Sequence, residues 1–499
     1  MNSKLLHIMR AWPFFLLLLP FFFMLHMLNE NFAPGLGATV LEQVFLYFAI
    51  ALVLNFFFFL LLKEVRKAAL VSLFLLSFNF FFGSLHDGLK SIAGEQIFLA
   101  KYVFIVPLII ILTAALVIGL KRTKKDISKV YLFLNILLFT LFAFEWVQLL
   151  PKIFQKNNSV SGHSQQFIDC DTCKQPDVYV IIADEYAGRQ ELKDVFSFDN
   201  TTFETELGSR GFHLVNNSRS NYNATVYSMA SLFNTGYINL SVKTKVTQGD
   251  ILLCTNLIDN SRVGSFFQSR GYTISNYSFF DFQDRENAVI SHLFSAPGKI
   301  ITDQTFVSRF AKEAGFNFFS KVKIKIDEGK DYYENLRNDE KIDSLTKKTV
   351  LQDKGKPKFV YAHFARPHAP FYFNREGKPF TADSHLQGFA RKKIEYTEYL
   401  LYTNKQLLNL VDHIVNESTK PPVILLASDH GCRFLPGEVA NEYNFMNLCA
   451  VLLPGSNYEQ FYNGMSTVNT FRAILNSTFG QQLAMQKDST VYLQLDMTK

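Results

Sequence analysis

Five apolar runs fill the first 150 residues of this 499-residue chain, and each is long enough, or nearly so, to cross a lipid bilayer. They cover residues 11–28, 41–62, 69–86, 103–120 and 130–150. The third and fourth are the weakest, the third because Asn79, Ser84 and His86 interrupt it. No small-residue cleavage site follows the first run, so a cleaved signal peptide is not expected. We therefore predict a transmembrane domain of five helices over residues 1–150, rather than five buried helices of a soluble protein.

The loops between these runs differ in charge, which predicts how the helices are oriented. Basic residues gather before the first run, between the second and third, and between the fourth and fifth: Lys4, Arg10, Lys63, Arg66, Lys67, Lys121, Arg122, Lys124, Lys125 and Lys129. The alternate loops, 29–40 and 87–101, carry no such excess. Loops rich in Lys and Arg stay in the cytoplasm, so we expect a cytoplasmic N-terminus and an exterior location for everything after residue 150. An even number of spans would reverse this orientation.

The charge balance of the remaining residues excludes several classes of protein. Residues 1–150 hold 12 Lys/Arg against 7 Asp/Glu, a net +5, and residues 151–499 hold 38 against 37, a net +1. A nucleic-acid-binding protein would carry its positive charge on a folded basic face, which a nearly neutral domain lacks. Disorder is excluded as well, because both parts are rich in Leu, Ile, Val and Phe.

A polar stretch over residues 151–175 predicts a linker between the transmembrane domain and a second domain over 176–499. It contains the pair Cys170 and Cys173, separated by two residues. A local disulfide is the favoured interpretation in an oxidising compartment. A redox or zinc role stays open, although no second pair of ligands completes a four-ligand site.

Strand and helix patterns alternate in the second domain. Short β-rich runs occur at 178–183, 358–364, 422–427 and 450–453, and an amphipathic helical pattern covers 394–415. The first and third runs are apolar almost throughout, as expected of central parallel strands that helices cover on both faces. The pattern predicts a doubly wound α/β fold, in which chemistry gathers at the carboxyl ends of strands. Residues 281–350 show few strand signals and are not placed.

Polar side chains follow directly after the predicted strands. Asp184 and Glu185 end the first, and Asp429 and His430 end the third. The second carries three basic side chains near its end: His363, Arg366 and His368. A lone Asp in such a place is usually a helix cap or a turn residue. Two carboxylates and an imidazole at neighbouring strand ends, however, suit a divalent metal ion such as Zn²⁺ or Mn²⁺.

A metal with three protein ligands still needs a nucleophile, and the segment 221–231 offers hydroxyls at Thr225, Ser228 and Ser231. In a structural interpretation, the serines pack one helix face and Thr225 caps the helix. In a functional interpretation, Thr225 lies among free backbone N–H groups at a helix N-terminus, which favour an anionic substrate. Metal coordination would lower the pKa of this hydroxyl enough to make it a nucleophile.

The order Asp184, Thr225, His368, Asp429-His430-Gly431 resembles the alkaline-phosphatase/sulfatase superfamily. With five spans in front, the chain looks most like the membrane-anchored branch, which includes lipoteichoic acid synthases and lipid A phosphoethanolamine transferases. The stretches HFARPHAPF (363–371) and VNTFRAILN (468–476) support the resemblance, which covers the spans and about residues 176–480.

The resemblance implies a role for each candidate residue. One metal ion would be bound by Asp184, Thr225, Asp429 and His430, with Glu185 as the alternative to Asp184. Thr225 would attack phosphorus and form a phosphothreonine intermediate. His368 would contact the transferred group or handle the proton of the leaving group, unless it is simply held by the backbone before Pro370. His363, Arg366 and Arg433 would contact the substrate.

Two departures from the family patterns narrow the chemistry. Sulfatases carry a Cys/Ser-x-Pro-x-Arg motif that matures to formylglycine, and the segment from Thr225 to Met229 lacks its Pro and Arg. Sulfate-ester hydrolysis by that route is therefore disfavoured. Alkaline phosphatases use further His residues for additional metals, whereas no His follows His430 in this chain. A centre with one metal ion is expected.

We therefore predict a bacterial inner-membrane enzyme with a periplasmic catalytic domain. It would move a phospho-group from a phospholipid donor onto an envelope glycan or lipid acceptor, using Zn²⁺ or Mn²⁺, with Mg²⁺ or Ca²⁺ as alternatives. A sulfatase-like hydrolase or phosphodiesterase and an inactive membrane scaffold are the other hypotheses. The sequon at Asn223 would place a glycan beside Thr225, which favours a bacterial host. The oligomeric state is not predicted.

Overall fold

The computed structural model describes residues 3–30, 36–93, 98–154, 160–161, 166–168, 175–239, 246, 248–289, 302–313, 333–352, 355–380, 388–435, 437 and 439–494. The chain forms two compact units. The helical unit comprises Met1–Asn157 and Leu293–Asp327. The second unit, which we call the sulfatase-like unit after the resemblance noted in its sequence, comprises Asn158–His292 and Glu328–Lys499. Cys170 and Cys173 lie outside the described residues, and Cys254, Cys432 and Cys449 are buried free thiols.

Four of the five predicted apolar runs fall within a helix of the helical unit, and the first, 11–28, coincides with α2 from Phe14 onward. The helices are α1 (Ser3–Ala11), α2 (Phe14–Glu30), α3 (Leu36–Leu62), α4 (Val65–Ala93), α5 (Tyr102–Arg122) and α6 (Ser128–Phe154), with the short η1 (Phe98–Ala100) before α5. Within the described residues, α3 to α6 are long and apolar enough to cross a membrane. The first run forms α2, which has 17 residues and is largely buried against its neighbours. The unit thus has four to five candidate spans.

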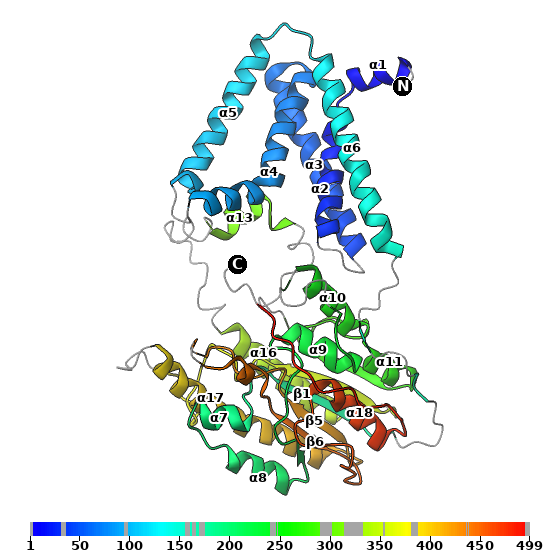
Figure 1. The fold of residues 1–499 in the computed structure, drawn as a ribbon, viewed down its shortest axis with the longest axis vertical. Coiled ribbons are helices and arrows are strands. Elements are labelled where there is room, and N and C mark those ends of the chain that lie inside the picture. The colour runs from blue at the N-terminus through cyan, green and yellow to red at the C-terminus, as the bar shows by residue number, and fades with distance from the viewer. Residues whose placement is uncertain are drawn as a thin grey trace. The chain divides into compact units, whose positions relative to one another are not determined.

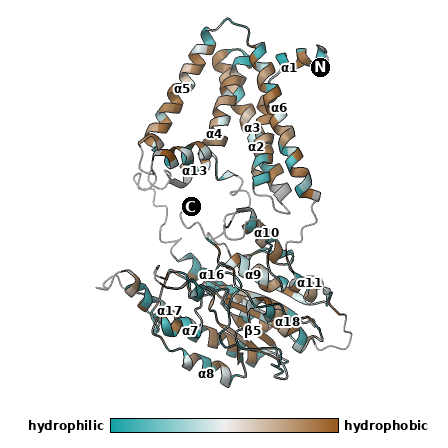
Figure 2. Cartoon of the chain, in the orientation of Figure 1, coloured by the Kyte–Doolittle hydropathy of each residue, from teal (hydrophilic) through white to brown (hydrophobic). Residues whose placement is uncertain are grey.

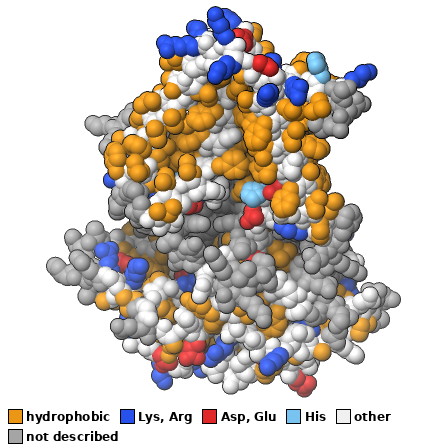
Figure 3. Space-filling model, turned by 45° about the horizontal axis from the view of Figure 1, so that its top comes forward, with side chains coloured by type: hydrophobic (Ala, Val, Ile, Leu, Met, Phe, Trp, Pro, Cys, Tyr) orange, Lys and Arg blue, Asp and Glu red, His pale blue; other side chains and the backbone are white. Residues whose placement is uncertain are grey.

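The surface of these helices is apolar, as Figures 2 and 3 show for α3 to α6 and for the faces in view. Large side chains such as Phe45, Val103 and Val147 have more than 60% of their area exposed. Only 6% of the most apolar stretch of α5 is buried. A face of this kind is stable in lipid but not in water, because water penalises exposed apolar area.

A short helix from far along the chain, α13 (Phe306–Glu313), also belongs to the helical unit. Its Phe306 ring packs 5.1 Å from that of Phe78 and 5.0 Å from that of Phe82 on α4. Arg309 donates to both carboxylate oxygens of Asp87, at 2.6 and 2.8 Å. This helix lies in the region that the sequence patterns left unplaced.

The sulfatase-like unit is built on a six-stranded mixed sheet in the order β2-β6-β5-β1-β4-β3. The strands are β1 (Val178–Ala183), β2 (His213–Leu214), β3 (Thr273–Tyr277), β4 (Lys358–Phe364), β5 (Val423–Ala427) and β6 (Cys449–Leu452). The four predicted strands are all present. β1, β3, β4 and β5 run parallel, whereas β6 and β2 complete one edge with antiparallel pairing.

Two groups of helices cover the faces of this sheet (Figure 1). One group contains α9 (Thr225–Asn234), α10 (Gln248–Asp259), α11 (Arg262–Ser269) and α18 (Thr467–Thr478). The other contains α7 (Arg189–Asp194), α8 (Thr201–Ser209), α16 (Glu334–Val350) and α17 (Gly388–Glu417), which includes the predicted helix over 394–415. Every side chain of β1 and β5 is buried between the two groups, which explains why these strands are apolar on both faces.

Candidate metal centre and active site

The register of the central strands brings three predicted site residues together. Ile182 of β1 pairs with His363 on β4 and with Ala427 on β5. Asp184 follows the end of β1, and Asp429 follows the end of β5. Both residues therefore lie just beyond this row of paired residues, at the same end of the sheet as the imidazole of His363. The ligand atoms of Asp184, His363 and Asp429 lie within 4.8 Å of one another, and all three residues are buried.

These three residues fit a divalent metal ion. Each has a buried atom without a hydrogen-bond partner among the described residues: Asp184 Oδ1, His363 Nε2 and Asp429 Oδ2. Buried polar atoms are rarely left in this state, because desolvation without a partner costs about 1–3 kcal/mol each. Two carboxylate oxygens and an imidazole nitrogen are suitable ligands for Zn²⁺ or Mn²⁺. The other nitrogen of His363, Nδ1, is hydrogen-bonded to the Tyr361 hydroxyl at 2.8 Å, which orients the ring.

The backbone fixes the orientation of Asp429. Its Oδ1 accepts hydrogen bonds from the amides of Glu185 at 3.0 Å and His430 at 2.9 Å. The other oxygen, Oδ2, is thereby directed toward the centre. Ser428 supports the same turn, because its hydroxyl donates to the carbonyl of His430 at 2.7 Å and accepts from the amide of Tyr186 at 2.9 Å.

The pKa values of the two carboxylates are shifted in opposite directions. Burial, followed by the charge of Asp429, raises the pKa of Asp184 well above its usual range. Burial also acts to raise the pKa of Asp429, but the imidazoles of His430 and His363 and the hydrogen bonds that it accepts lower that pKa overall. Burial lowers the pKa of His363 to about 4, so its imidazole is neutral at pH 7. A neutral imidazole is the form that binds metal ions.

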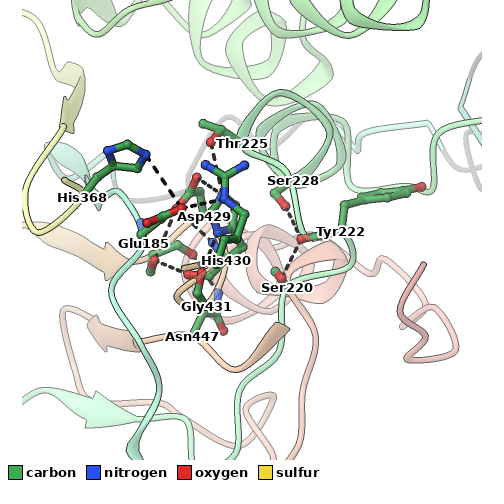
Figure 4. A network of polar contacts seen from close by, with 12 residues as sticks. Glu185, Ser220, Tyr222, Thr225, Ser228, His368, Asp429, His430, Gly431 and Asn447 are labelled. Atoms are coloured by element: carbon green, nitrogen blue, oxygen red, sulfur yellow. Dashed lines mark hydrogen bonds and ion pairs between the residues drawn. The ribbon is translucent and has the colours of Figure 1, made fainter. Parts of the chain in front are cut away.

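Thr225 is the first residue of α9, and its hydroxyl points toward this group of residues (Figure 4). Thr225 Oγ1 lies 3.3 Å from His430 Nε2, which in turn lies 3.1 Å from Asp429 Oδ2. The helix cap is Ala224, which has no side-chain hydrogen bond, so Thr225 does not serve as the cap. His430 Nδ1–H donates to the Gly431 carbonyl at 2.7 Å, which leaves the lone pair of Nε2 facing the threonine.

The other two hydroxyls of this segment have structural partners. Ser228 Oγ donates to the carbonyl of Tyr222 at 2.8 Å, and Ser231 Oγ donates to that of Gly236 at 2.8 Å. Both serines are fully buried. We call Asp184, His363, Asp429 and His430 the strand-end cluster. Of the three hydroxyls, only that of Thr225 contacts this cluster.

Glu185 joins two more predicted residues to the site. It adopts a left-handed backbone conformation, with φ +56°. Its Oε1 accepts a hydrogen bond from Arg433 Nε at 2.6 Å and lies 3.8 Å from His368 Nε2. Burial acts to raise the pKa of Glu185, but the charges of His368 and Arg433 lower it overall, so this carboxylate is ionised. His368 keeps 18% of its side-chain area exposed and can meet a ligand.

Arg366 lies in different surroundings. Its Nε is 3.7 Å from Asp339 Oδ2, and only 6% of its side chain is exposed. The carboxylate of Asp339 also accepts hydrogen bonds from the amides of Ala365 and Arg366, at 2.7 and 3.1 Å. This arrangement ties α16 to the end of β4. A phosphate contact for Arg366 stays a prediction.

Two further residues support the site: Gly431, which the sequence motif already contained, and Glu191, which the sequence did not indicate. A Cβ at Gly431 would lie 2.3 Å from the Tyr443 carbonyl, so glycine is needed there for close packing rather than for a positive φ. Glu191 is fully buried below this loop and accepts from the amide of Cys432 at 3.1 Å. A glutamate on a short polar helix carries no local signal of such burial.

The fold and the converging side chains define a class: an α/β enzyme domain of the alkaline-phosphatase/sulfatase superfamily, with transferases or hydrolases as its members. Residues 178–498 match the Sulfatase family model, and the chain belongs to this family. No curated protein matches the chain.

Several solved structures are similar to the chain. One is the C-terminal periplasmic domain of EptC from Escherichia coli in complex with Zn, with 13% identity, 67% of this chain and 90% of that chain covered, and a TM-score of 0.40. A second is the same domain of phosphoethanolamine transferase EptC from Campylobacter jejuni, with 14% identity, coverage of 63% and 92%, and a TM-score of 0.35. A third is a phosphonate monoester hydrolase from Silicibacter pomeroyi, with 12% identity, coverage of 63% and 75%, and a TM-score of 0.39. These scores are too low to carry a functional argument.

Proposed function

We propose that this protein is a membrane-anchored phosphotransferase. It would move a phospho-group from a phospholipid head group to an envelope glycan or lipid through a phosphothreonine at residue 225. The observation that carries the proposal is the chain of short distances from Thr225 Oγ1 to His430 Nε2 and on to Asp429 Oδ2, at 3.3 and 3.1 Å. Family membership supports an enzymatic role for these residues.

The first step is attack of Thr225 Oγ1 on phosphorus. Burial lowers the pKa of His430, so its imidazole is neutral and Nε2 can accept the threonine proton. A bond forms between Oγ1 and phosphorus while the bond from phosphorus to the leaving alcohol breaks. The first amides of α9 have no partner within the helix, so they stabilise the negative charge of the phosphoryl oxygens.

A divalent ion would be held by Asp184, Asp429 and a histidine. The ligand atom of His363 lies close to those of Asp184 and Asp429. His430, which the sequence analysis named as the ligand, has its Nε2 beside the hydroxyl of Thr225. The ion, Zn²⁺ or Mn²⁺ with Mg²⁺ or Ca²⁺ as alternatives, would supply positive charge that lowers the pKa of the hydroxyl and neutralises the phosphoryl group.

His368 is suited to the second proton transfer. His368 Nε2 lies 3.8 Å from Glu185 Oε1, and a protonated imidazole at this place can donate to the departing alcohol oxygen. In the second half-reaction the neutral imidazole of His368 takes the proton from the acceptor hydroxyl as its oxygen bonds to phosphorus. The bond between phosphorus and Thr225 Oγ1 breaks, and His430 returns the proton that it took in the first step to Oγ1. Water in the acceptor's place would turn the same centre into a hydrolase.

The location follows from the helices and the charges of their loops. We place the sulfatase-like unit on the exterior side of a bacterial inner membrane, because the basic loops predict a cytoplasmic N-terminus and we count the shorter α2 together with α3 to α6 as five spans. The helices keep this unit beside its lipid substrate, which raises the effective concentration of that substrate.

Intact-protein mass spectrometry tests the proposal. The purified full chain is incubated with metal and with vesicles of a phospholipid that carries an isotope-labelled head group. A mass increase that matches the labelled phospho-group, mapped to the peptide that contains Thr225, is the expected result. A Thr225→Ala protein should show no increase. Release of labelled head group without any adduct in either protein would reject the phosphothreonine, and an adduct at another residue would reassign the nucleophile.

A further inference from the structure

The turn that follows β1, residues 184–188, is held in place through its backbone amides. It carries Asp184 and Glu185 and ends where α7 begins. Its five amides each donate to a group far along the chain at 2.9 or 3.0 Å, in chain order to the Phe364 carbonyl, Asp429 Oδ1, Ser428 Oγ, the Tyr396 hydroxyl and the Met446 carbonyl. Four of these acceptors lie on or beside strands of the sheet, whereas Tyr396 lies on α17.

Glu185 needs such support because of its backbone conformation. In an extended strand successive side chains point to opposite faces, so Asp184 and Glu185 could not both serve one site. The left-handed φ of +56° at Glu185 turns the chain at this point. Asp184 belongs to the strand-end cluster, and the carboxylate of Glu185 meets Arg433 and His368, as Figure 4 shows for His368. A residue other than glycine adopts a left-handed conformation at a cost in free energy, and keeps it only where its surroundings hold it.

The Tyr396 hydroxyl spans the two peptide groups that follow Glu185. It donates to the Glu185 carbonyl at 2.8 Å and accepts from the Ala187 amide at 2.9 Å. Burial raises the pKa of Tyr396 well above its usual range, so the hydroxyl stays protonated and makes both hydrogen bonds at once. Tyr396 is fully buried, so a single hydroxyl inside the domain closes the turn at Glu185.

The ring of Tyr396 contacts the segments that carry the two partners of Glu185. Its centroid lies 5.4 Å from that of Phe434, the residue after Arg433. It lies 5.9 Å from the centroid of Phe371, three residues after His368. Tyr396 therefore touches all three segments, that of Glu185 with its hydroxyl and the other two with its ring. Because it is buried, it can influence a substrate only through these segments.

We propose that Tyr396 is a positioning residue, whose hydroxyl holds Glu185 in the conformation that brings its carboxylate to Arg433 and His368. The expected effect on catalysis rests on the proposed function, in which His368 transfers a proton. The effect on the turn does not rest on it, so the two effects can be measured separately.

Hydrogen exchange of the full chain, measured by mass spectrometry, tests whether Tyr396 holds the turn. Tyr396→Phe keeps the ring and removes the hydroxyl, so the Ala187 amide loses its acceptor. Exchange of this amide, seen in peptides that cover residues 184–188, should become about tenfold faster or more. Equal exchange of these peptides in the unsubstituted protein and in Tyr396→Phe would overturn the proposal.

Tyr222→Phe is the matched control. The Tyr222 hydroxyl is also buried, and it joins a backbone carbonyl and a backbone amide, both of Ile238, at 3.4 and 2.8 Å. Figure 4 shows its ring pointing away from the other labelled residues. This variant should leave exchange at residues 184–188 unchanged.

Turnover tests whether the held turn matters for catalysis. With vesicles of the head-group-labelled phospholipid, Tyr396→Phe should lower kcat about tenfold or more, whereas Tyr222→Phe should stay within about twofold. Metal bound after dialysis should be equal in the three proteins. Equal kcat of the two variants would overturn the proposal. So would loss of metal from Tyr396→Phe, because the effect would then belong to the metal ligands.

A double-mutant cycle with Glu185→Gln separates positioning from general destabilisation. If Tyr396 acts through Glu185, Tyr396→Phe should change kcat by no more than about twofold once Glu185→Gln is present. The same fold-loss in both backgrounds would overturn the proposal. If the unsubstituted chain releases no labelled head group and forms no adduct, the proposed function fails. Exchange at residues 184–188 then decides by itself whether Tyr396 holds Glu185.

Discussion

The two units of this protein bury opposite kinds of side chain. The sulfatase-like unit encloses charged residues at its centre, among them Asp184, Asp429 and Glu191. The helical unit places large apolar side chains on its surface, and among its described residues the buried charged groups are few, chiefly Glu145 and Lys67. The difference shows that each unit is matched to its own solvent. In the first, backbone amides and prospective ligands satisfy the interior charges; in the second, lipid takes the place of water around the helices.

The largest effect is expected from Thr225→Ala, which tests whether the interior polar residues of the sulfatase-like unit serve chemistry rather than stability. Loss of a nucleophile typically lowers turnover by about 10³-fold or more. The free energy of unfolding should hardly change, because the hydroxyl contacts only the strand-end cluster. Steady-state turnover and denaturant unfolding measure both effects.

Ser228→Ala is the matched control one helical turn away. It should cost about 1 kcal/mol of stability through its lost hydrogen bond to Tyr222, and leave turnover within a few-fold. If the two variants behave alike, Thr225 is a structural residue and the contrast between the units loses its functional meaning.

Asp429→Asn should lower metal affinity by about 100-fold or more, since a ligand oxygen and a negative charge are lost from the centre. Bound metal is measured after dialysis by elemental mass spectrometry. Asp339→Asn serves as the control, because Asp339 is equally buried but pairs with Arg366. It should cost about 1–3 kcal/mol of stability and leave metal content unchanged. Loss of metal in the control alone would move the ion to another site.

The pH dependence of metal binding should reveal the raised pKa of Asp184. Without metal, the raised pKa means that this carboxyl keeps its proton at pH values at which an ordinary aspartate is ionised. Binding of the metal ion must therefore displace that proton. Affinity should rise about tenfold per pH unit up to the raised pKa and level off above it. The metal-free unit should lose stability over the same interval, because its folded state binds the proton more tightly than the unfolded chain does. Calorimetric titrations across pH would measure this, and Asp184→Asn should abolish the slope.

The smallest effect concerns the boundary between the units. A chain truncated to residues 175–499 would carry α13 without α4, so that Phe306 loses its contacts with Phe78 and Phe82. We expect this fragment to bind lipid vesicles in a sedimentation assay. Replacing Phe306 and Phe310 with Ser should reduce the bound fraction several-fold. Equal binding of both fragments would show that α13 does not contribute to membrane association.

Much of the sheet around the candidate site could be predicted because it follows from local patterns. The apolar runs of β1, β4 and β5 defined their strands, and the residues at the ends of parallel strands necessarily approach one another. That argument is sufficient to bring Asp184 and Asp429 together. The direction of β6 could not be predicted, since a four-residue apolar run looks the same in parallel and antiparallel pairing.

Other features depend on contacts between distant parts of the chain. His363 was expected to contact substrate, and its proximity to Asp184 and Asp429 became evident only through the register of β4 with β1. The packing of α13 on α4 joins residues more than 200 positions apart, for which a single sequence holds no signal. The burial of Glu191 also depends on a distant segment, because its carboxylate accepts from the amide of Cys432.

The two amides that hold Asp429 Oδ1 have a consequence for how the protein responds to metal scarcity. They belong to the backbone of the strand ends, so the ligand geometry exists before any ion arrives. Chelation should therefore silence the enzyme without unfolding it, in contrast to a zinc finger. Activity should then follow the supply of the ion, falling when it is withdrawn and recovering on its return with no need for new synthesis.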